Sequence, residues 1–410
     1  MRNFAVLNAN NMGKKVSEHI TWVGKVDWQL TKFHGDELST PHGSSYNSYL
    51  VRGAERTVLV DTVWQPFDCE FVSRLRQEID LNEIDAIVMN HNEIDHSGAM
   101  PELMRALPAG VPIYCTAKGE AILRAHYHQD WNYCNVHTGD TLDLGGGVVL
   151  TFFEAPMLHW PDTMFTHVSA DNVLLSNDGF GQHYASESLF NDCVPTDELM
   201  WEAMKYYANI LAPFSPMVKR KLAELQGMGL QIDMIAPSHG VIWKENPAQI
   251  VEAYAKWCDA YAENRVTIVY DTMWNSTRLM AEAIAEGIGQ AAPDVTVKLC
   301  NAAQHDKNDI LTEAFRSKAV LAGCPTINTG ISYAMAGLLE MLKGLKLKGK
   351  AGAAFGSFGW SCEGVKHIAS ELTASGFRLV NPDGISVKFV PDEAALERCR
   401  AFGREFITSL

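Results

Sequence analysis

The last third of the chain alternates strictly between short apolar runs and amphipathic stretches, and this alternation constrains the fold more than any other feature. We expect strands at 266–270, 295–300, 319–323, 351–355 and 378–388, helices at 277–289, 308–316, 332–343 and 363–375 between them, and a terminal helix at 392–408. Strands joined by helices need crossover connections, which favour parallel pairing. The sequence therefore predicts a doubly wound α/β domain with a parallel sheet at 264–410.

The first part of the chain follows a different pattern. Short strand-like runs such as SSYNSYLV, TVLVDTV and IDAIVMN are separated by turns, and helical patterns appear at 68–79, 196–226 and 246–264. Hairpins mixed with helices are typical of two packed sheets with helices outside. The helix at 246–264 should close this unit, so we expect a first domain at 1–263.

Composition limits the partners and the location that we expect. Lys and Arg number 34 against 49 Asp and Glu, and the net charge of −15 repels phosphate backbones and anionic membranes. We therefore expect neither nucleic acid nor a membrane as a partner. The nine cysteines form no C-x-x-C pair, which argues against a disulfide framework and a fused four-thiolate iron site. With an N-terminus that lacks a signal-peptide core, this predicts a cytoplasmic protein.

Residues of metal-ligand type gather directly after predicted strands. The run HNEIDH at 91–96 follows IDAIVMN, and alternation in an extended segment places His91, Glu93 and Asp95 on one side. Any one such residue alone is more often a loop or cap residue, but four strands end in them. The candidate ligands are His91, Glu93, Asp95, His96, His159, Asp178 and His239.

These seven residues predict a binuclear metal site. Three carboxylates beside the imidazoles make a harder ligand set than that of a dizinc hydrolase, which favours iron. Asp178 is placed as a bridge between two ions. The other ligands divide into His91, Glu93 and His159 for one ion and Asp95, His96 and His239 for the other. The adjacent His96 can turn away from Asp95, so its role as a ligand stays open.

Three loops of the second domain indicate a cofactor site. The loop TMWNST opens a helix, where backbone N–H groups and hydroxyls form an anion cradle. GCPTINTGIS and GSFGWSCEG follow the third and fourth strands and should converge with it where the strand order reverses. The absence of G-x-G-x-x-G and of a Walker lysine motif counts against dinucleotides and nucleoside triphosphates. The candidate residues are Thr272, Met273, Trp274, Asn275, Ser276, Thr277, Pro325, Thr326, Ile327, Asn328, Thr329, Gly330, Ser357, Phe358, Gly359, Trp360 and Ser361, with Trp274, Phe358 and Trp360 able to stack on a planar ring.

The motifs of the two domains resemble those of known families. H-x-E-x-D-H resembles the metallo-β-lactamase motif H-x-H-x-D-H, with Glu93 in place of the second His. The second domain resembles a flavodoxin whose first loop carries Asn275-Ser276-Thr277 instead of T-G-x-T. A metallo-β-lactamase-like αββα sandwich followed by a flavodoxin-like domain resembles the flavodiiron proteins (A-type flavoproteins) over essentially the whole chain. The resemblance implies one FMN and two non-haem irons per chain, and an oxidoreductase that reduces dioxygen to water, nitric oxide to nitrous oxide, or both.

The same resemblance implies further site residues and partners. It places His34 and Tyr207 near the gas pocket as donors outside the ligand set, and we interpret Asp61 as a strand-end residue that orients the metal loops. It implies a separate electron donor, a rubredoxin-like protein or a flavoprotein reductase, and a head-to-tail homodimer or dimer of dimers. Two other functions remain open: a dizinc hydrolase with a regulatory flavodoxin domain, and a pure electron-transfer module.

Overall fold

The computed structural model describes residues 13–410, and the first twelve residues of the predicted first domain lie outside the described part. The chain divides into two compact units. Residues up to Tyr206 group with Pro216–Ala255, and Tyr207–Ser215 groups with Lys256–Leu410. The boundary predicted from the sequence lies between 263 and 264, so the structural division differs from it at 256–263 and at the separate segment 207–215.

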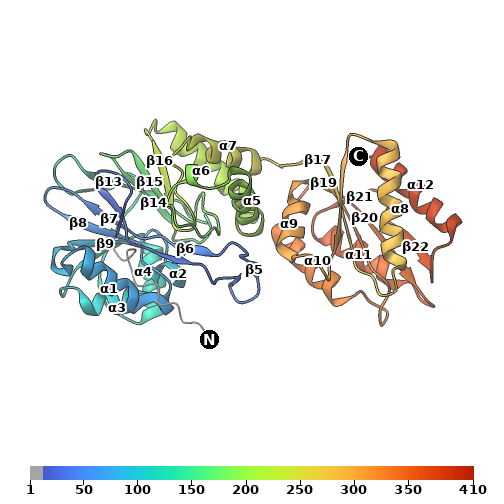
Figure 1. The fold of residues 1–410 in the computed structure, drawn as a ribbon, viewed down its shortest axis with the longest axis horizontal. Coiled ribbons are helices and arrows are strands. Elements are labelled where there is room, and N and C mark those ends of the chain that lie inside the picture. The colour runs from blue at the N-terminus through green and yellow to red at the C-terminus, as the bar shows by residue number, and fades with distance from the viewer. Residues whose placement is uncertain (1–12) are drawn as a thin grey trace. The chain divides into compact units, whose positions relative to one another are not determined.

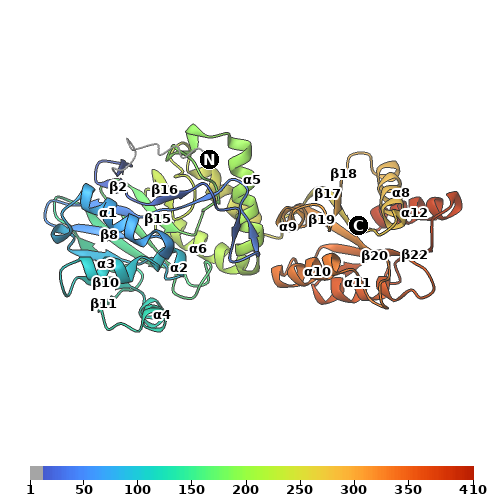
Figure 2. The same ribbon diagram turned by 60° about the horizontal axis from the view of Figure 1, so that its bottom comes forward.

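Two sheets face each other in the first unit (Figures 1 and 2). The seven-stranded sheet has the order β1 (Lys14–Lys15), β2 (Ile20–Trp22), β7 (Tyr49–Arg52), β8 (Thr57–Val60), β9 (Ala86–Val88), β10 (Pro112–Cys115), β11 (Asn132–Asn135). The five-stranded sheet has the order β12 (Thr141–Asp143), β13 (Val149–Glu154), β14 (Met164–Val168), β15 (Val173–Asn177), β16 (Met234–Pro237). Two small pairs, β3 (Lys25–Asp27) with β6 (Ser44–Tyr46) and β4 (Lys32–Phe33) with β5 (Leu38–Ser39), complete it.

Helices cover the outer faces of both sheets (Figure 1). Those on the seven-stranded sheet are α1 (Asp68–Glu78), α2 (Ile94–Ser97), α3 (Met100–Ala106) and α4 (Ala117–Tyr127), and those on the other side are α5 (Thr196–Tyr206), α6 (Ser215–Gly227) and α7 (Ala248–Trp257). Val60, Phe152 and Leu175 are buried between the sheets, whereas Leu75 and Leu103 are buried under the helices. Burial of apolar side chains on both faces of the seven-stranded sheet stabilises the layers. The predicted αββα sandwich is confirmed.

Two helical predictions need correction. The pattern at 196–226 is not one helix, because a π-helical turn at Tyr207–Leu211 and a 3-10 turn at Ala212–Phe214 separate α5 from α6. Pro213 lacks an N–H donor and interrupts the helical ladder there. The helix predicted at 246–264 ends at Trp257, and Glu263 already belongs to a strand. An ion pair between Glu263 and Arg316 Nε (2.7 Å) links the start of that strand to the rest of the second unit.

The second unit is a parallel sheet between two layers of helices (Figure 1). Its order is β18 (Thr296–Asn301), β17 (Glu263–Tyr270), β19 (Ser317–Gly323), β20 (Ala351–Phe358), with β21 (Arg378–Leu379) and β22 (Ile385–Lys388) both pairing with β20. One face carries α8 (Ser276–Ala291) and α12 (Glu393–Thr408), and the other carries α9 (Lys307–Arg316), α10 (Tyr333–Leu345) and α11 (Glu363–Ala374). Chain order reverses between β17 and β19, as expected for a doubly wound sheet. Within residues 13–410, no helix combines the length and apolar character needed to cross a bilayer.

Candidate metal centre and cofactor cavity

The candidate metal ligands come from loops at the carboxyl ends of strands in both sheets. His91 and Glu93 lie in the loop after β9, Asp95 and His96 in the helix α2 that follows it, His159 after β13, Asp178 after β15, and His239 after β16. The structure brings all seven together in two groups, each with its ligand atoms within 4.8 Å of one another. Because the segment turns into α2, Asp95 does not share a side with His91 and Glu93 as the predicted extended segment required, and it belongs to the other group. His96, whose role the sequence left open, belongs to the second group.

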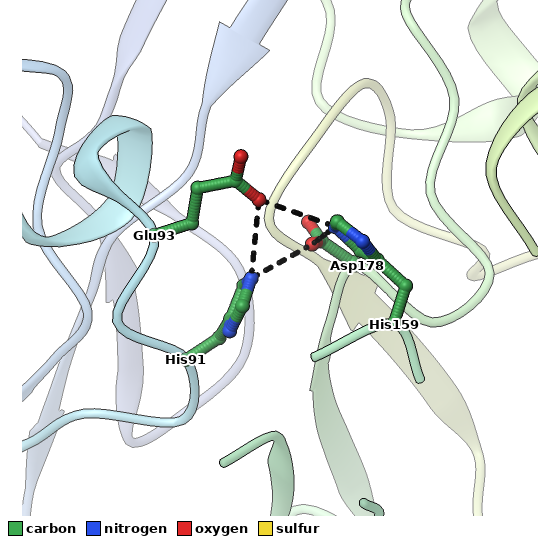
Figure 3. A group of neighbouring side chains, drawn as sticks. All are labelled: His91, Glu93, His159 and Asp178. Carbon is green, nitrogen blue, oxygen red and sulfur yellow. Dashed lines mark hydrogen bonds and ion pairs between the residues drawn. The ribbon is translucent and has the colours of Figure 1, made fainter. Parts of the chain in front are cut away.

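The first group joins His91, Glu93, His159 and Asp178 (Figure 3). Asp178 Oδ2 lies 3.5 Å from His91 Nε2 and 3.1 Å from His159 Nε2. Glu93 Oε2 lies 3.4 Å from His91 Nε2 and 3.3 Å from His159 Nε2. Two imidazole nitrogens and two carboxylate oxygens therefore converge on one point from three loops.

The second group joins Asp95, His96 and His239, and it also contacts Asp178. Asp95 Oδ2 lies 3.1 Å from His96 Nε2 and 3.0 Å from His239 Nε2. Asp178 Oδ1 lies 3.0 Å from His96 Nε2 and 3.5 Å from His239 Nε2. One oxygen of Asp178 thus faces each group, which is the geometry of a carboxylate shared between two cations.

The spacing and burial of these atoms fit metal ions. Ligand atoms bound at about 2.1 Å and at right angles lie about 3.0 Å apart, and tetrahedral ligands lie about 3.4 Å apart. The observed separations of 3.0–3.5 Å cover both values. Asp95 Oδ1 is buried and has no hydrogen-bond partner among the described residues. A buried carboxylate oxygen in that state is costly unless a cation or a proton donor binds it.

The electrostatics of the site also favour cations. Burial alone would raise the pKa of the Asp178 carboxyl, but the imidazoles of His96 and His159 hold it well below its ordinary value. Burial would lower the pKa of His91, yet its hydrogen bonds with Asp162 and Glu93 raise it to about 10. The carboxylates therefore stay ionised, and buried negative charges are stable only with positive charge beside them. A metal cation supplies that charge in place of protons on the imidazoles.

Residues outside the ligand set hold the ligands in orientation. His91 Nδ1 donates to Asp162 Oδ1 (3.3 Å), and Asp162 Oδ2 accepts from the backbone N–H of Asn92 (2.9 Å). His239 Nδ1 donates to the carbonyl of Ser45 (2.7 Å). Such partners fix which ring nitrogen faces a metal. Asp162 and Ser45 were not predicted from the sequence, because no local motif links them to His91 and His239, which are far away along the chain.

Asp61 performs the orienting role that the sequence analysis assigned to it. Its Oδ1 accepts from the backbone N–H of Asn90 (2.8 Å), and its Oδ2 accepts from the side-chain amides of Asn90 and Asn177 (both 3.2 Å). Asn90 directly precedes His91, and Asn177 directly precedes Asp178. Asp61 therefore ties together the two loops that carry these ligands, and it belongs to neither ligand group.

The two residues expected near the gas pocket take different places. His34 Nε2 lies 2.9 Å from Glu93 Oε1. Tyr207 is buried in the second unit, where its hydroxyl pairs with Ser215 (2.9 Å) and its ring packs against Trp257 and Phe315. This corrects the expectation for Tyr207.

The preceding residue, Tyr206, lies beside one of the metal-ligand residues instead. The ring of Tyr206 lies 5.1 Å from that of His183 and 6.2 Å from that of His239. Side chains of successive residues on a helix point about 100° apart, so neighbouring tyrosines face different surroundings.

A cavity of about 550 Å³ opens beside the metal-ligand groups. Its polar lining includes His34, Glu93 and Asp95, and its apolar lining includes Phe33, Trp64 and Trp160. These aromatic residues were not predicted from the sequence. A small ligand in this cavity lies beside one carboxylate of each ligand group.

A second cavity, of about 460 Å³, lies at the carboxyl ends of β17, β19 and β20 in the second unit. Twelve of the seventeen predicted cofactor residues line it: Met273, Trp274, Ser276, Pro325, Thr326, Asn328, Thr329, Ser357, Phe358, Gly359, Trp360 and Ser361. The other five, Thr272, Asn275, Thr277, Ile327 and Gly330, lie in the same loops without lining it. Phe389, directly after β22, also lines the cavity and was missed.

The lining suits a flavin mononucleotide. Trp274 and Trp360 are 82% and 92% exposed, which leaves two aromatic faces free to stack on a planar ring. Asn275 makes no side-chain cap on helix α8, so the N–H groups of its first turn face the loop. A phosphate group bound beside that turn satisfies these N–H donors.

Comparison with known proteins agrees with the fold of both domains. Residues 45–240 match the ODP family of beta-lactamases, and residues 268–403 match the flavodoxin family. An anaerobic nitric oxide reductase flavorubredoxin from Escherichia coli O1:K1 is 52% identical over 391 residues, covering 95% of this chain and 81% of the relative. The structure of rubredoxin oxygen:oxidoreductase from Desulfovibrio gigas matches with a TM-score of 0.92 at 36% identity, covering 97% of this chain and 98% of that one. A flavodiiron protein from Giardia intestinalis matches with 0.90 at 32%, covering 97% and 96%.

The fold and these relatives define a flavoprotein oxidoreductase that joins a β-lactamase-like domain to a flavodoxin domain. These two relatives cover nearly the whole chain. Their sequence identities of 52% and 36% are high enough to show the family as well as the fold. The chain belongs to the flavodiiron protein family.

Proposed function

We propose that this chain binds two irons and one FMN and reduces nitric oxide to nitrous oxide, dioxygen to water, or both. The observation that carries the proposal is the carboxylate of Asp178, whose two oxygens each face two imidazoles. When bound, two irons and a two-electron flavin supply the four electrons that dioxygen requires. The relatives named as a nitric oxide reductase and as a rubredoxin oxygen:oxidoreductase support both substrates.

The chain's own residues would hold these groups and the protons. We propose all seven ligand-type residues as iron ligands with Asp178 as the bridge, and the seventeen loop residues and Phe389 as the FMN site. His34 would donate a hydrogen bond to Glu93, and we now propose Tyr206 for the role first assigned to Tyr207. Burial raises the pKa of the Tyr206 phenol well above its ordinary value, so the hydroxyl keeps its proton and can donate.

Metal analysis with gas kinetics tests this function directly. Protein produced with both iron and zinc available should contain about two irons per chain, because the site holds three carboxylates beside its imidazoles. The anaerobically reduced protein should then consume nitric oxide or dioxygen, and the ratio of the two kcat/KM values ranks the substrates. Stoichiometric zinc without iron would support the dizinc hydrolase with a regulatory flavodoxin domain. Oxidation of reduced FMN without gas consumption would support a pure electron-transfer module.

The electron donor and the location follow from the same proposal. We propose that a rubredoxin-like protein or a flavoprotein reductase reduces the FMN, in line with the rubredoxin named for the Desulfovibrio relative. We place the protein in the cytoplasm, because its nine cysteines are all free and a reducing compartment keeps thiols in that state. Rapid reduction of the FMN by NADH alone would contradict a separate donor.

We also propose a head-to-tail homodimer, or a dimer of such dimers. Electron transfer weakens steeply with distance, so the FMN and the irons that it serves must lie close together. In the proposed arrangement, the flavin of one subunit serves the metal site of the other. A two-fold axis then creates two equivalent pairs of sites.

Mixed dimers test this arrangement. One chain carries His91→Ala with Asp178→Ala and keeps its flavin, and the other carries Ser276→Asp and keeps its metals. The chains are co-expressed with different tags, and the heterodimer is isolated through both tags. We expect about half of the wild-type activity, because one of the two symmetric site pairs is intact. An inactive heterodimer that retains iron in one chain and FMN in the other would show that the centres communicate within a chain.

A further inference from the structure

A row of aromatic side chains leads from the metal-ligand groups to the surface of the first unit. The ring of Trp160 lies 5.3 Å from that of His91, and His126 lies 6.3 Å from Trp160. His126 lies 5.9 Å from Tyr127, the ring of Tyr127 lies 5.6 Å from Trp131, and that of Trp131 lies 6.4 Å from Tyr133. These are centroid separations, so successive rings are near van der Waals contact.

The row combines the residue types and exposure that one-electron transfer needs. Trp and Tyr are the side chains, besides Cys and Met, that lose one electron most readily. Trp160 lines the cavity that Glu93 and Asp95 also line. Trp131 and Tyr133 are half-buried and flank the exposed Asn132. The row therefore has one end at the metal-ligand groups and the other within reach of solutes.

The phenol of Tyr127 has an acceptor for its hydrogen bond. The Ser97 hydroxyl donates to the backbone carbonyls of Asn92 and Glu93 (both 3.0 Å), which leaves its oxygen free to accept. The Tyr127 hydroxyl lies 2.8 Å from Ser97 Oγ, which can accept its proton when the Ser97 hydroxyl donates to either carbonyl. A phenol loses an electron more easily when its proton is held by an acceptor, because the radical forms as the proton shifts toward it.

We propose that Trp160, Tyr127, Trp131 and Tyr133 form an accessory electron path between a small thiol at the protein surface and the metal centre. His126 bridges the gap between Trp160 and Tyr127. The proposal rests on the proposed function, in which dioxygen is reduced at the irons. The path acts when dioxygen arrives and FMN cannot supply its two electrons. It thereby prevents the release of partly reduced oxygen or damage to the ligands.

The electrons and protons of this step balance. Reduction of dioxygen to two waters takes four electrons and four protons. Oxidation of two Fe(II) to two Fe(III) provides two of the electrons, and the aromatic row provides the other two, one at a time. Each electron leaves an oxidised side chain that is restored from the surface, where two thiols (RSH) form one disulfide and release two electrons and two protons. The remaining two protons come from solvent.

The test uses the complete iron- and FMN-loaded enzyme, reduced by either two or four electrons per chain and mixed with excess dioxygen. Two electrons per chain are two fewer than dioxygen needs, whether they reside on the irons or on the FMN. Freeze-quenched samples are examined by electron paramagnetic resonance, and oxidised residues are located by mass spectrometry. Protein with ring-deuterated tyrosine distinguishes a tyrosyl radical, whose signal narrows, from a flavin semiquinone.

We expect a tyrosyl or tryptophanyl radical in the half-reduced enzyme, and oxidation products at Trp131 and Tyr133. Added thiol should remove both and be converted to disulfide. Tyr127→Phe and Trp131→Phe keep an aromatic ring in place but interrupt the path, so oxidation at Tyr133 should be lost and products should accumulate at Trp160. Tyr114→Phe is the matched control, because Tyr114 stacks on Phe152 (6.1 Å) outside the row. It should behave like the wild type.

The outcomes separate the accessory path from the proposed function. If the fully reduced wild-type enzyme consumes dioxygen but forms no radical when half-reduced, the path does not exist. The same conclusion follows if Tyr127→Phe and Trp131→Phe leave the radical and the oxidation map unchanged. If the fully reduced enzyme consumes no dioxygen, dioxygen reduction fails as a function, and the path fails with it.

Discussion

Asp178→Ala is expected to remove both metal ions and to abolish gas reduction. One oxygen of this carboxylate faces His91 and His159, and the other faces His96 and His239. Its loss leaves four imidazoles without the shared negative charge. Loss of a residue that only hydrogen-bonds to a metal ligand weakens metal binding by about 10- to 100-fold. Loss of the bridging ligand itself should therefore weaken metal binding by more than about 100-fold. Iron content per chain and the affinity from Fe(II) titration measure the effect.

Two further variants make that result interpretable. Asp178→Asn keeps the volume of the side chain, so it separates loss of charge from a packing defect, and it should also fail to retain two irons. Asp171→Asn is the matched control, because Asp171 is a buried carboxylate that pairs with His19 Nδ1 (2.7 Å) and belongs to neither ligand group. It should keep full iron content. An Asp178→Ala protein with two irons and normal turnover would refute the bridge.

Ser276→Asp is expected to abolish FMN binding while the flavodoxin domain stays folded. Ser276 is the first residue of α8 and lines the cavity of the second unit. A carboxylate at a helix N-terminus stabilises the helix itself, but it repels a phosphate at the same place. Two charges about 4 Å apart at an effective dielectric constant near 20 repel by about 4 kcal/mol, which corresponds to a roughly 1000-fold loss of affinity. Fluorescence titration with FMN measures the loss.

Riboflavin provides the control for this prediction, because it carries the same ring without the phosphate. Its weaker binding should change little in Ser276→Asp, whereas FMN binding should collapse to a similar level. Thr196→Asp places the same charge at the first residue of α5 in the other unit and should leave FMN binding unchanged. If Ser276→Asp binds FMN as tightly as the wild type, the phosphate does not bind at the N-terminus of α8.

The sequence by itself predicted the layered architecture of both domains. Strand and helix periodicity marked the five strand regions of the second domain, and the last of them forms two short strands, β21 and β22. It also indicated the loops that carry ligands, because polar residues directly after buried strands must lie at a sheet edge. The seven ligand-type residues and twelve of the cavity-lining loop residues were found in this way.

The tertiary structure alone decided how the ligands are oriented and which neighbours support them. Asp162 is distant from His91 in sequence, and only the packing of two sheets brings its carboxylate to the ring nitrogen. The choice between Tyr206 and Tyr207 depended on where α5 gives way to a π-helical turn, which periodicity does not locate. Periodicity also did not locate the end of α7 at Trp257 or the start of β17 at Glu263. Local patterns describe a chain's own faces, whereas contacts between distant segments are determined only when the complete core has packed.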